Sequence, residues 1–387
     1  MPNLSENVTR LSPSATFEMA ARSAALSASG IDVVNLSVGE PDFNTPDHIK
    51  EAARKAIEEN YSKYSPVVGY ASLREAVCAK LLRENGLVYE PSEILISGGA
   101  KQSVCNAVMS LAGPGDEVII PAPYWVSYPQ MVNLAGGTPV FIPTSIAGGF
   151  KITPESLEAA ITPKTKLLIL CSPCNPTGAV YSKQELEALA QVVLRHEGLY
   201  VLSDEIYEHI CYVDGPFSIA ACPGMRERTI VVNGVSKAYA MTGWRIGFMA
   251  APRWIVSACG LLQGQYTSGP CSVSQKAAEA AWNGPQECVE SMRESFRRRR
   301  DLMVRLLRGI PGLVVNEPEG AFYIFPDFSS YSAKVPDLAM YLLEQAHVAT
   351  VNGSAFGAPG HLRLSYATSE DRIEEAAGRI KSALELL

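Results

Sequence analysis

The sequence has no apolar run that approaches the roughly 20 residues needed for a membrane-spanning helix. Its first stretch, MPNLSENVTRLSPSATFEMA, also has no apolar core of the kind found in secretory signal peptides. Internal repeats and low-complexity segments are missing as well. These absences exclude the membrane-protein and repeat-protein classes, and they predict a cytoplasmic globular protein without a membrane partner.

An extended stripe of lysine and arginine is also missing, and the formal net charge of -7 is mildly acidic. One basic run exists, at residues 297–300, inside MRESFRRRRDLMVRLL. Its helical spacing is more typical of a solvated helix face than of a binding patch. We therefore expect no nucleic-acid partner.

The nine cysteines are scattered, and most have apolar neighbours, which favours small buried residues over a disulfide framework. Cys171 and Cys174 alone have C-x-x-C spacing, in CSPCNPTG. That spacing occurs in redox sites and in half of a zinc site. No second ligand pair follows at zinc-finger spacing, and the motif ends a predicted strand instead of opening a helix. A packing role is therefore the expectation, and no metal site is predicted.

What the sequence does contain is an alternation of short apolar runs with amphipathic stretches, typical of parallel βαβ units. The helices include 100–112 and 182–196. The near-continuous apolar character of the strands predicts burial on both faces of the sheet. The predicted strands are 93–97, 116–121, 138–143, 166–173, 199–205, 229–236 and 247–252.

The C-terminal third has a different texture and predicts a smaller α+β unit. A long helix over 285–308 precedes GLVVNEPEGAFYIFPDF, which is typical of two strands around a turn. Residues 1–46 are too few to fold alone. The predicted organisation is a large α/β domain over 47–283 and a small domain over 284–387, which the segment 1–46 joins.

Ligands of open parallel sheets bind beyond the carboxyl ends of the strands, so the residues that follow each strand are the candidates. Gly99, Ala100 and Lys101 lie in GGAKQS, where a helix begins, and backbone N–H groups there suit a phosphate. Trp125, in PAPYWVSYP, follows the next strand. It is either a core residue or a flat surface on which a planar ring stacks.

Three further candidates follow the central strands. Asn175, between two prolines, is either a turn residue or a fixed hydrogen-bond donor. Asp204 ends an apolar strand, and a buried carboxylate needs a cation, either a structural arginine or a protonated heterocyclic nitrogen. Tyr207 lies three residues further on.

The stretch VNGVSKAYAMTGWRIGF places Ser236, Lys237 and Arg245 after the next strand. A lysine in such small, apolar surroundings suits attack on a carbonyl, because desolvation favours its neutral amine. Together the candidates match pyridoxal phosphate. Lys237 would meet its aldehyde and Asp204 its ring nitrogen, while Arg245 and the GGAK turn would bind its phosphate. Asn175 and Tyr207 would contact its ring oxygen.

At this point the sequence resembles the fold-type-I pyridoxal-phosphate enzymes, and within them the class I aminotransferases. The resemblance extends over residues 35–369 and is most similar to the bacterial and plant-plastid aspartate aminotransferases. It implies a large domain with a mostly parallel central sheet flanked by helices, plus a smaller α+β domain. It rests on NLSVGEPDFNTP, YSPVVGYASLREA, GGAKQ, PAPYWVSYP, SPCNPTG, SDEIYEH, SKAYAMTGWRIG, EGAFYIFPDF and HLRLSYATS, in family order.

The resemblance also implies roles. Lys237, Asp204 and Tyr207 would be catalytic. Arg363 would bind the substrate carboxylate, which Gly39 would approach through its backbone. The cofactor set would be Gly99, Ala100, Lys101, Trp125, Asn175, Asp204, Tyr207, Ser236, Lys237 and Arg245, with Tyr64 reaching the phosphate of a neighbouring subunit. The substrate set would be Gly39, Trp125, Asn175, Arg363, Thr16 and Lys101, of which Thr16 and Lys101 resemble positions that recognise an acidic side chain.

The expected activity is that of a homodimeric aspartate aminotransferase, which moves the amino group of L-aspartate to 2-oxoglutarate. A prephenate, aromatic or broad-specificity aminotransferase is the alternative within the fold. Ser145 stands where prephenate-accepting relatives tend to have a basic residue, which disfavours prephenate. The segment after Ser332 is also shorter than in similar proteins. A lyase, or a pyridoxal-phosphate regulator fused to a DNA-binding module, are alternatives from other classes.

Overall fold

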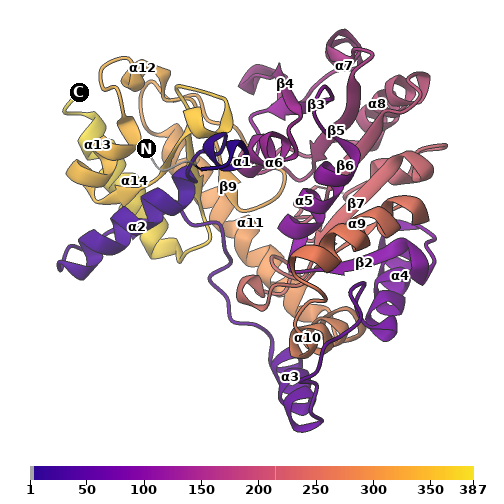
Figure 1. Cartoon of the computed structure of the whole chain (residues 1–387). Coiled ribbons are helices and arrows are strands. Elements are labelled where there is room, and N and C mark those ends of the chain that lie inside the picture. Colours follow the sequence, from indigo (N-terminus) through magenta and orange to yellow (C-terminus); the bar gives the residue numbers. More distant parts are fainter. Residues whose placement is uncertain (1–3, 214) are drawn as a thin grey trace.

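The computed structural model describes residues 4–213 and 215–387, and its largest element is a seven-stranded sheet within those ranges (Figure 1). The strand order is β2-β8-β7-β6-β5-β3-β4. Only β8 runs against its neighbours, so the sheet is mostly parallel. The strands are β2 (Ile94–Ser97), β3 (Glu117–Ala122), β4 (Thr138–Pro143), β5 (Thr165–Cys171), β6 (Tyr200–Asp204), β7 (Thr229–Gly234) and β8 (Gly247–Ala250).

Helices cover both faces of this sheet, which explains why its strands have few polar residues. One face packs against α3 and α4 together with α10, and the opposite face packs against α5, α6 and α9. The helices are α3 (Asp47–Glu58), α4 (Ala71–Asn85), α5 (Ala100–Leu111), α6 (Ser127–Ala135), α7 (Pro154–Ala160), α8 (Lys183–Arg195), α9 (Arg253–Tyr266) and α10 (Ser272–Asn283).

Local sequence explains where these helices begin. Before α8, the hydroxyl of Ser182 accepts a hydrogen bond from the Glu185 N–H, and the Glu185 carboxylate accepts one from the Ser182 N–H at 2.7 Å. This reciprocal pair satisfies two N–H groups that a helix start leaves without a partner. Within the described residues, no helix combines the length and apolar character that crossing a membrane requires.

The C-terminal part packs on its own apolar core, and α11 runs from this core toward the sheet (Figure 1). The ring centre of Phe296 on α11 lies 5.2 Å from the ring centre of Phe322 and 5.3 Å from that of Phe43. The elements are α11 (Glu287–Arg308), β9 (Tyr323–Ile324), α12 (Ser329–Ser332), α13 (Leu338–Ala346), β10 (Val348–Ala349), β11 (Val351–Asn352), β12 (Leu362–Ser365) and α14 (Glu370–Leu384).

The prediction of two strands in residues 312–328 is wrong in part, because only β9 forms. Val314 makes an isolated bridge to Asp327. Between them, the Asn316 side chain takes the place of a strand ladder. Its amide donates to the Thr177 carbonyl at 2.8 Å and accepts from the Phe325 N–H at 3.0 Å. Side-chain hydrogen bonds of this kind compete with sheet pairing.

The start of the chain packs on its end. Residues of α1 (Glu6–Thr9) and α2 (Ala15–Ala28) precede β1 (Val34–Asn35), which pairs in parallel with β10. The Asp32 carboxylate accepts from Arg372 at 2.9 Å and from Arg379 at 2.6 Å, both on α14. These two hydrogen bonds lower the pKa of Asp32 to about 2. The segment that carries Ser37 and Gly39 is thereby held beside β12.

Replacing Phe296 with alanine should destabilise the protein by about 3–5 kcal/mol, because the ring is fully buried and a cavity would remain. The free energy of unfolding from denaturant titration measures this change. Leu386→Ala is the matched control, since Leu386 is 80% exposed, and it should stay within about 0.5 kcal/mol of the unchanged protein. Equal stability of the two variants would contradict the assignment of Phe296 to the core.

Candidate active site

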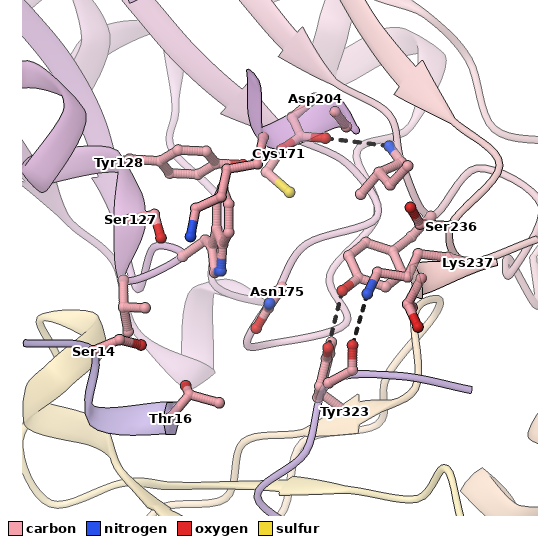
Figure 2. Close-up of a pocket in the computed structure, with 18 of the residues that line it drawn as sticks. Ser14, Thr16, Ser127, Tyr128, Cys171, Asn175, Asp204, Ser236, Lys237 and Tyr323 are labelled. Atoms are coloured by element: carbon pink, nitrogen blue, oxygen red, sulfur yellow. Dashed lines mark hydrogen bonds between the residues drawn. The ribbon is translucent and has the colours of Figure 1, made fainter. Parts of the chain in front are cut away.

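A cavity of about 460 Å³ opens beyond the carboxyl ends of the parallel strands, between the sheet and the N- and C-terminal segments. The structure brings most of the predicted residues together there, from segments far apart in the sequence (Figure 2). Two predicted residues, Gly99 and Tyr64, do not line it. The predicted residues that do are Thr16, Gly39, Ala100, Lys101, Trp125, Asn175, Asp204, Tyr207, Ser236, Lys237, Arg245 and Arg363.

Lys237 lies just after β7, and its Nζ donates a hydrogen bond to the Gly39 carbonyl at 2.7 Å (Figure 2). Burial lowers the pKa of this amine to about 8, because the surroundings disfavour its charged form. A large neutral fraction is therefore present near pH 8, as attack on a carbonyl requires. A Cβ at position 39 would lie 2.5 Å from the Tyr323 Oη. Glycine at this position therefore lets the backbone lie against Tyr323 while its carbonyl accepts from the lysine.

Asp204 is the last residue of β6, and its side chain is buried. Its carboxylate accepts from the Tyr128 hydroxyl at 2.6 Å and from the Ile206 N–H at 3.3 Å. Burial raises its pKa, and these hydrogen bonds oppose that rise. Among the described residues no lysine or arginine forms an ion pair with it, so the structural-arginine interpretation has no support. A protonated ring nitrogen would supply the missing cation.

Arg363 on β12 is 1% exposed and carries no carboxylate partner among the residues described. Its Nη1 donates to the Asn175 Oδ1 at 3.0 Å and its Nη2 to the Ser37 carbonyl at 2.6 Å, while its Nε has no partner. The guanidinium carbon lies 4.5 Å from the centre of the Tyr323 ring. A buried guanidinium without a counter-charge, in the wall of a cavity, suits an anionic ligand.

Tyr207 and Tyr323 form a pair of buried phenols whose hydroxyls lie 2.9 Å apart (Figure 2). Burial raises the pKa of Tyr207 well above its ordinary value, so its hydroxyl keeps its proton and remains a donor. Asn175, the other predicted ring-oxygen partner, turns its Oδ1 to Arg363 and so leaves its amide N–H₂ group as the donor.

The predicted phosphate end combines a helix start with an arginine. Gly99 caps α5 with φ of 91°, a backbone conformation that favours glycine. Arg245 donates to the Thr242 carbonyl at 2.9 Å and to the Gly98 carbonyl at 3.1 Å, which orients its guanidinium beside the first turn of α5. Ala100 and Ser236 line the same end of the cavity. Backbone N–H groups, a hydroxyl and a guanidinium together suit a phosphate.

Lys101, Trp125 and Thr16 also line the cavity. Lys101 Nζ sits 5.1 Å from the centre of the Trp125 ring and 5.9 Å from that of Phe17. Burial lowers the pKa of Lys101, and the positive charge of Arg245 lowers it further. Thr16 faces the same space from α2. A cation and a hydroxyl are thus available to an acidic side chain.

Tyr64 lies outside the cavity of its own chain, with 98% of its surface exposed. Its predicted contact with a neighbouring subunit stays a prediction. Tyr128 and Tyr323 are residues that sequence reasoning missed, although both lie in motifs that carry the family resemblance. Tyr128 follows Trp125 by three residues and lies in the first turn of α6, just after Trp125, and that spacing was the available signal.

These groups fit pyridoxal phosphate. The cavity offers a partly neutral lysine amine, a buried carboxylate without a cation and a phosphate-sized cradle, and these are the partners of the cofactor's aldehyde, ring nitrogen and phosphate. Comparison with known proteins agrees with this fit. The family model for aminotransferases of class I and II matches residues 31–380.

The chain belongs to the class I and II aminotransferases. Two relatives match it over nearly their full length. A protein from Cereibacter sphaeroides named aspartate/prephenate aminotransferase is 48% identical over 99% of this chain and 98% of its own. The aspartate aminotransferase of Geobacillus stearothermophilus is 47% identical over 99% of each chain.

Solved structures give the same result. The Rhizobium meliloti aspartate aminotransferase superposes with a TM-score of 0.95 at 45% identity over 99% of each chain. The Thermus thermophilus enzyme with maleate gives 0.94 at 46% identity, over 99% of this chain and 100% of the other. The predicted fold, enzyme class and pyridoxal-phosphate dependence of this aminotransferase are therefore confirmed.

Tyr128→Phe should shift the acid limb of the kcat/KM profile to higher pH by about one unit, because a hydrogen bond to a charged group contributes about 1.5–3 kcal/mol. The Tyr128 hydroxyl lowers the pKa of Asp204, so its loss leaves the raising effect of burial unopposed by that bond. The carboxylate would then be protonated, and activity lost, at a higher pH than before.

The control is Tyr331→Phe, which removes a hydroxyl that donates to the Pro311 carbonyl, away from the cavity. Its profile should match that of the unchanged enzyme. An unmoved acid limb in Tyr128→Phe would show that this phenol does not set the charge of Asp204.

Proposed function

We propose that this aminotransferase transfers the amino group of L-aspartate to 2-oxoglutarate, giving oxaloacetate and L-glutamate. The observation that carries the proposal is the buried guanidinium of Arg363, which faces the cavity without a carboxylate partner among the described residues. An amino-acid α-carboxylate would supply the missing charge and place the α-carbon within the cavity of Lys237. The cation of Lys101, in the wall of the same cavity, suits a second carboxylate, as in aspartate.

The residues of the cavity divide the work. When bound, pyridoxal phosphate supplies an aldehyde carbon for amine exchange and an electron-accepting ring. Lys237 Nζ, with its lowered pKa, would take the α-proton of the amino acid and would then donate that proton to a different carbon atom. Asp204 keeps a proton on the ring nitrogen, and Tyr207 donates to the ring oxygen. Arg363 orients the substrate through its α-carboxylate, with Gly39 nearby.

The remaining assignments concern the phosphate, the ring and the side chain of the substrate. Ala100, Ser236 and Arg245 would hold the phosphate, Gly99 would form the turn that leads into this cradle, and Trp125 would stack on the ring. Thr16 and Lys101 would contact the acidic side chain, and the Asn175 N–H₂ group would donate to the ring oxygen.

A prephenate aminotransferase is the second candidate. The Cereibacter sphaeroides relative and the Petunia hybrida relative, 49% identical, carry prephenate in their names. Ser145 in this chain caps a short helix by accepting from the Gly148 N–H, and it does not line the cavity. No positive charge is therefore contributed from this position, which favours aspartate as the principal amino donor.

The large part over 47–283 and the small part over 284–387, joined by 1–46, are the proposed domains. The cavity lies where these three segments meet, since Ser37, Asn175 and Arg363 bond across them. Movement of the small domain toward the sheet would narrow the cavity and exclude water while the proton is transferred.

We also propose a cytoplasmic homodimer with shared active sites. All nine cysteines are free thiols, which suits a reducing compartment. Tyr64 is almost fully exposed, and Leu261 and Tyr266 are 75% and 64% exposed, so apolar surface is available for a partner. Tyr64 would then complete the phosphate site of the neighbouring subunit.

The proposed reaction is tested by single-turnover absorbance of the bound cofactor. Aspartate should change the spectrum quickly and 2-oxoglutarate should reverse it, whereas arogenate and phenylalanine should act more slowly. Lys237→Ala should abolish turnover. Arg363→Lys should lower kcat/KM about 100-fold, because an ammonium cannot replace the planar fork.

The control for Arg363→Lys is Arg298→Lys, which changes an exposed arginine on α11 and should leave kcat/KM unaltered. Fast conversion by arogenate would instead support the prephenate candidate. Oxoacid-independent elimination would indicate a lyase, and full turnover by Lys237→Ala would refute the proposed function.

Subunit mixing tests the shared site. Tyr64→Ala should lower activity about tenfold or more through loss of a charge-assisted hydrogen bond, and Lys237→Ala should be inactive. Refolding the two variants together should restore activity, because a mixed dimer has one site with both native residues. Unchanged activity in the mixture, compared with the two variants assayed separately, would argue against a Tyr64 contribution across subunits.

A further inference from the structure

The C-x-x-C pair has surroundings that the sequence did not reveal. Cys171 is the last residue of β5, and its thiol lines the active-site cavity beside Asp204 and Tyr128 (Figure 2). Cys174 lies behind it, 9% exposed, within an apolar cluster that includes Phe150 and Phe325. The pair therefore connects the active-site cavity to the core of the turn that follows β5.

The two thiols are close neighbours. Cys171 Sγ lies 3.4 Å from the Pro173 carbonyl oxygen, which belongs to the peptide group that precedes Cys174. Both side chains also border one small void on the far side of the turn. A hydrogen bond between the thiols raises the pKa of Cys171 and lowers that of Cys174. Neither sulfur is held in a metal cluster among the described residues, since the one candidate group contains no cysteine.

The residue that follows this pair, Asn175, connects the two cysteines to Arg363. Asn175 follows Cys174 directly, and its Oδ1 is one of the two protein acceptors that hold the Arg363 guanidinium, at 3.0 Å. Formation of a disulfide draws two sulfurs to bonding distance, about 2.0 Å, and the backbone of a short turn moves with them. Such a movement reaches Asn175 first, and then the orientation of Arg363.

We propose that Cys171 and Cys174 are an oxidant-sensitive dithiol whose conversion to a disulfide disables the active site by moving Asn175 away from Arg363. The oxidant is a peroxide, which enters through the cavity. Cys174 has the lower pKa of the two, so its thiolate attacks the peroxide oxygen and becomes a sulfenic acid, and one water is released. The Cys171 thiol then attacks that sulfur, its proton and the OH group of the sulfenic acid leave as a second water, and the disulfide forms. In sum, two thiols are oxidised and one peroxide is reduced to two waters.

The proposal goes beyond amino-group transfer, because the disulfide can be detected without any assay of turnover. The reduced holoenzyme is treated with hydrogen peroxide, quenched with catalase, unfolded, alkylated and digested. The peptide that contains both cysteines should escape alkylation and be lighter by two hydrogen atoms than its reduced form. Activity should fall at least about tenfold, since small displacements of a binding group cost that much or more. Dithiothreitol should restore it.

Two variants make the test specific. Cys174→Ser cannot form the disulfide, so dithiothreitol-reversible loss of activity should disappear in it. Cys271→Ser removes an exposed thiol that is outside the cavity and should respond to peroxide as the unchanged enzyme does. An excess of maleate, a dicarboxylate whose charge would pair with Arg363, should slow oxidation by filling the cavity.

Three results would overturn the proposal. The first is that no disulfide-bonded peptide containing Cys171 and Cys174 is found after oxidation. The second is full activity in enzyme that contains this disulfide. The third is equal, reversible sensitivity of Cys174→Ser and the unchanged enzyme. Each differs from a failure of the proposed function, which would leave the enzyme inactive toward aspartate before any peroxide is added.

Discussion

The active site depends on one buried cation for which the described residues supply no counter-charge. Arg363 is held by the Asn175 side chain and the Ser37 carbonyl, both uncharged, so it is oriented but not neutralised. Burying a charge in this way is unfavourable by several kcal/mol unless a partner arrives. The three residues come from the turn after β5, the N-terminal segment and β12. The same interaction therefore joins the parts of the fold and makes them receptive to a carboxylate.

The same rule explains two further groups in the cavity. Asp204 is a buried carboxylate that forms no ion pair among the described residues, and Lys237 is a lysine whose pKa burial lowers to about 8. Each group is poised by desolvation for a partner that the protein does not supply. Perturbed groups of opposite charge that gather in one cavity mark functional sites. Ion pairs within the protein would have neutralised these groups and lowered the affinity of the site for cofactor and substrate.

The turn after β5 has two roles. It presents Asn175 to Arg363, and it also carries the two thiols of Cys171 and Cys174. The N-terminal segment has a similar double role. Asp32 ties it to α14, and five residues later Ser37 reaches Arg363. Packing far from the cavity thus helps to position the groups that are proposed to bind substrate.

The sequence by itself determined the alternation of strands and helices, and with it the sheet edge where ligands bind. Lys237, Asp204, Asn175 and Arg245 were predictable, because each follows a strand whose apolar pattern is plain. Local patterns cannot show which distant groups meet, since those contacts arise only when the chain folds. Tertiary structure alone decided that Tyr128 donates to Asp204, that Tyr323 lies against Arg363, and that Asn316 replaces a strand ladder. It alone placed Cys171 in the cavity wall, because a C-x-x-C spacing does not say what its sulfurs face.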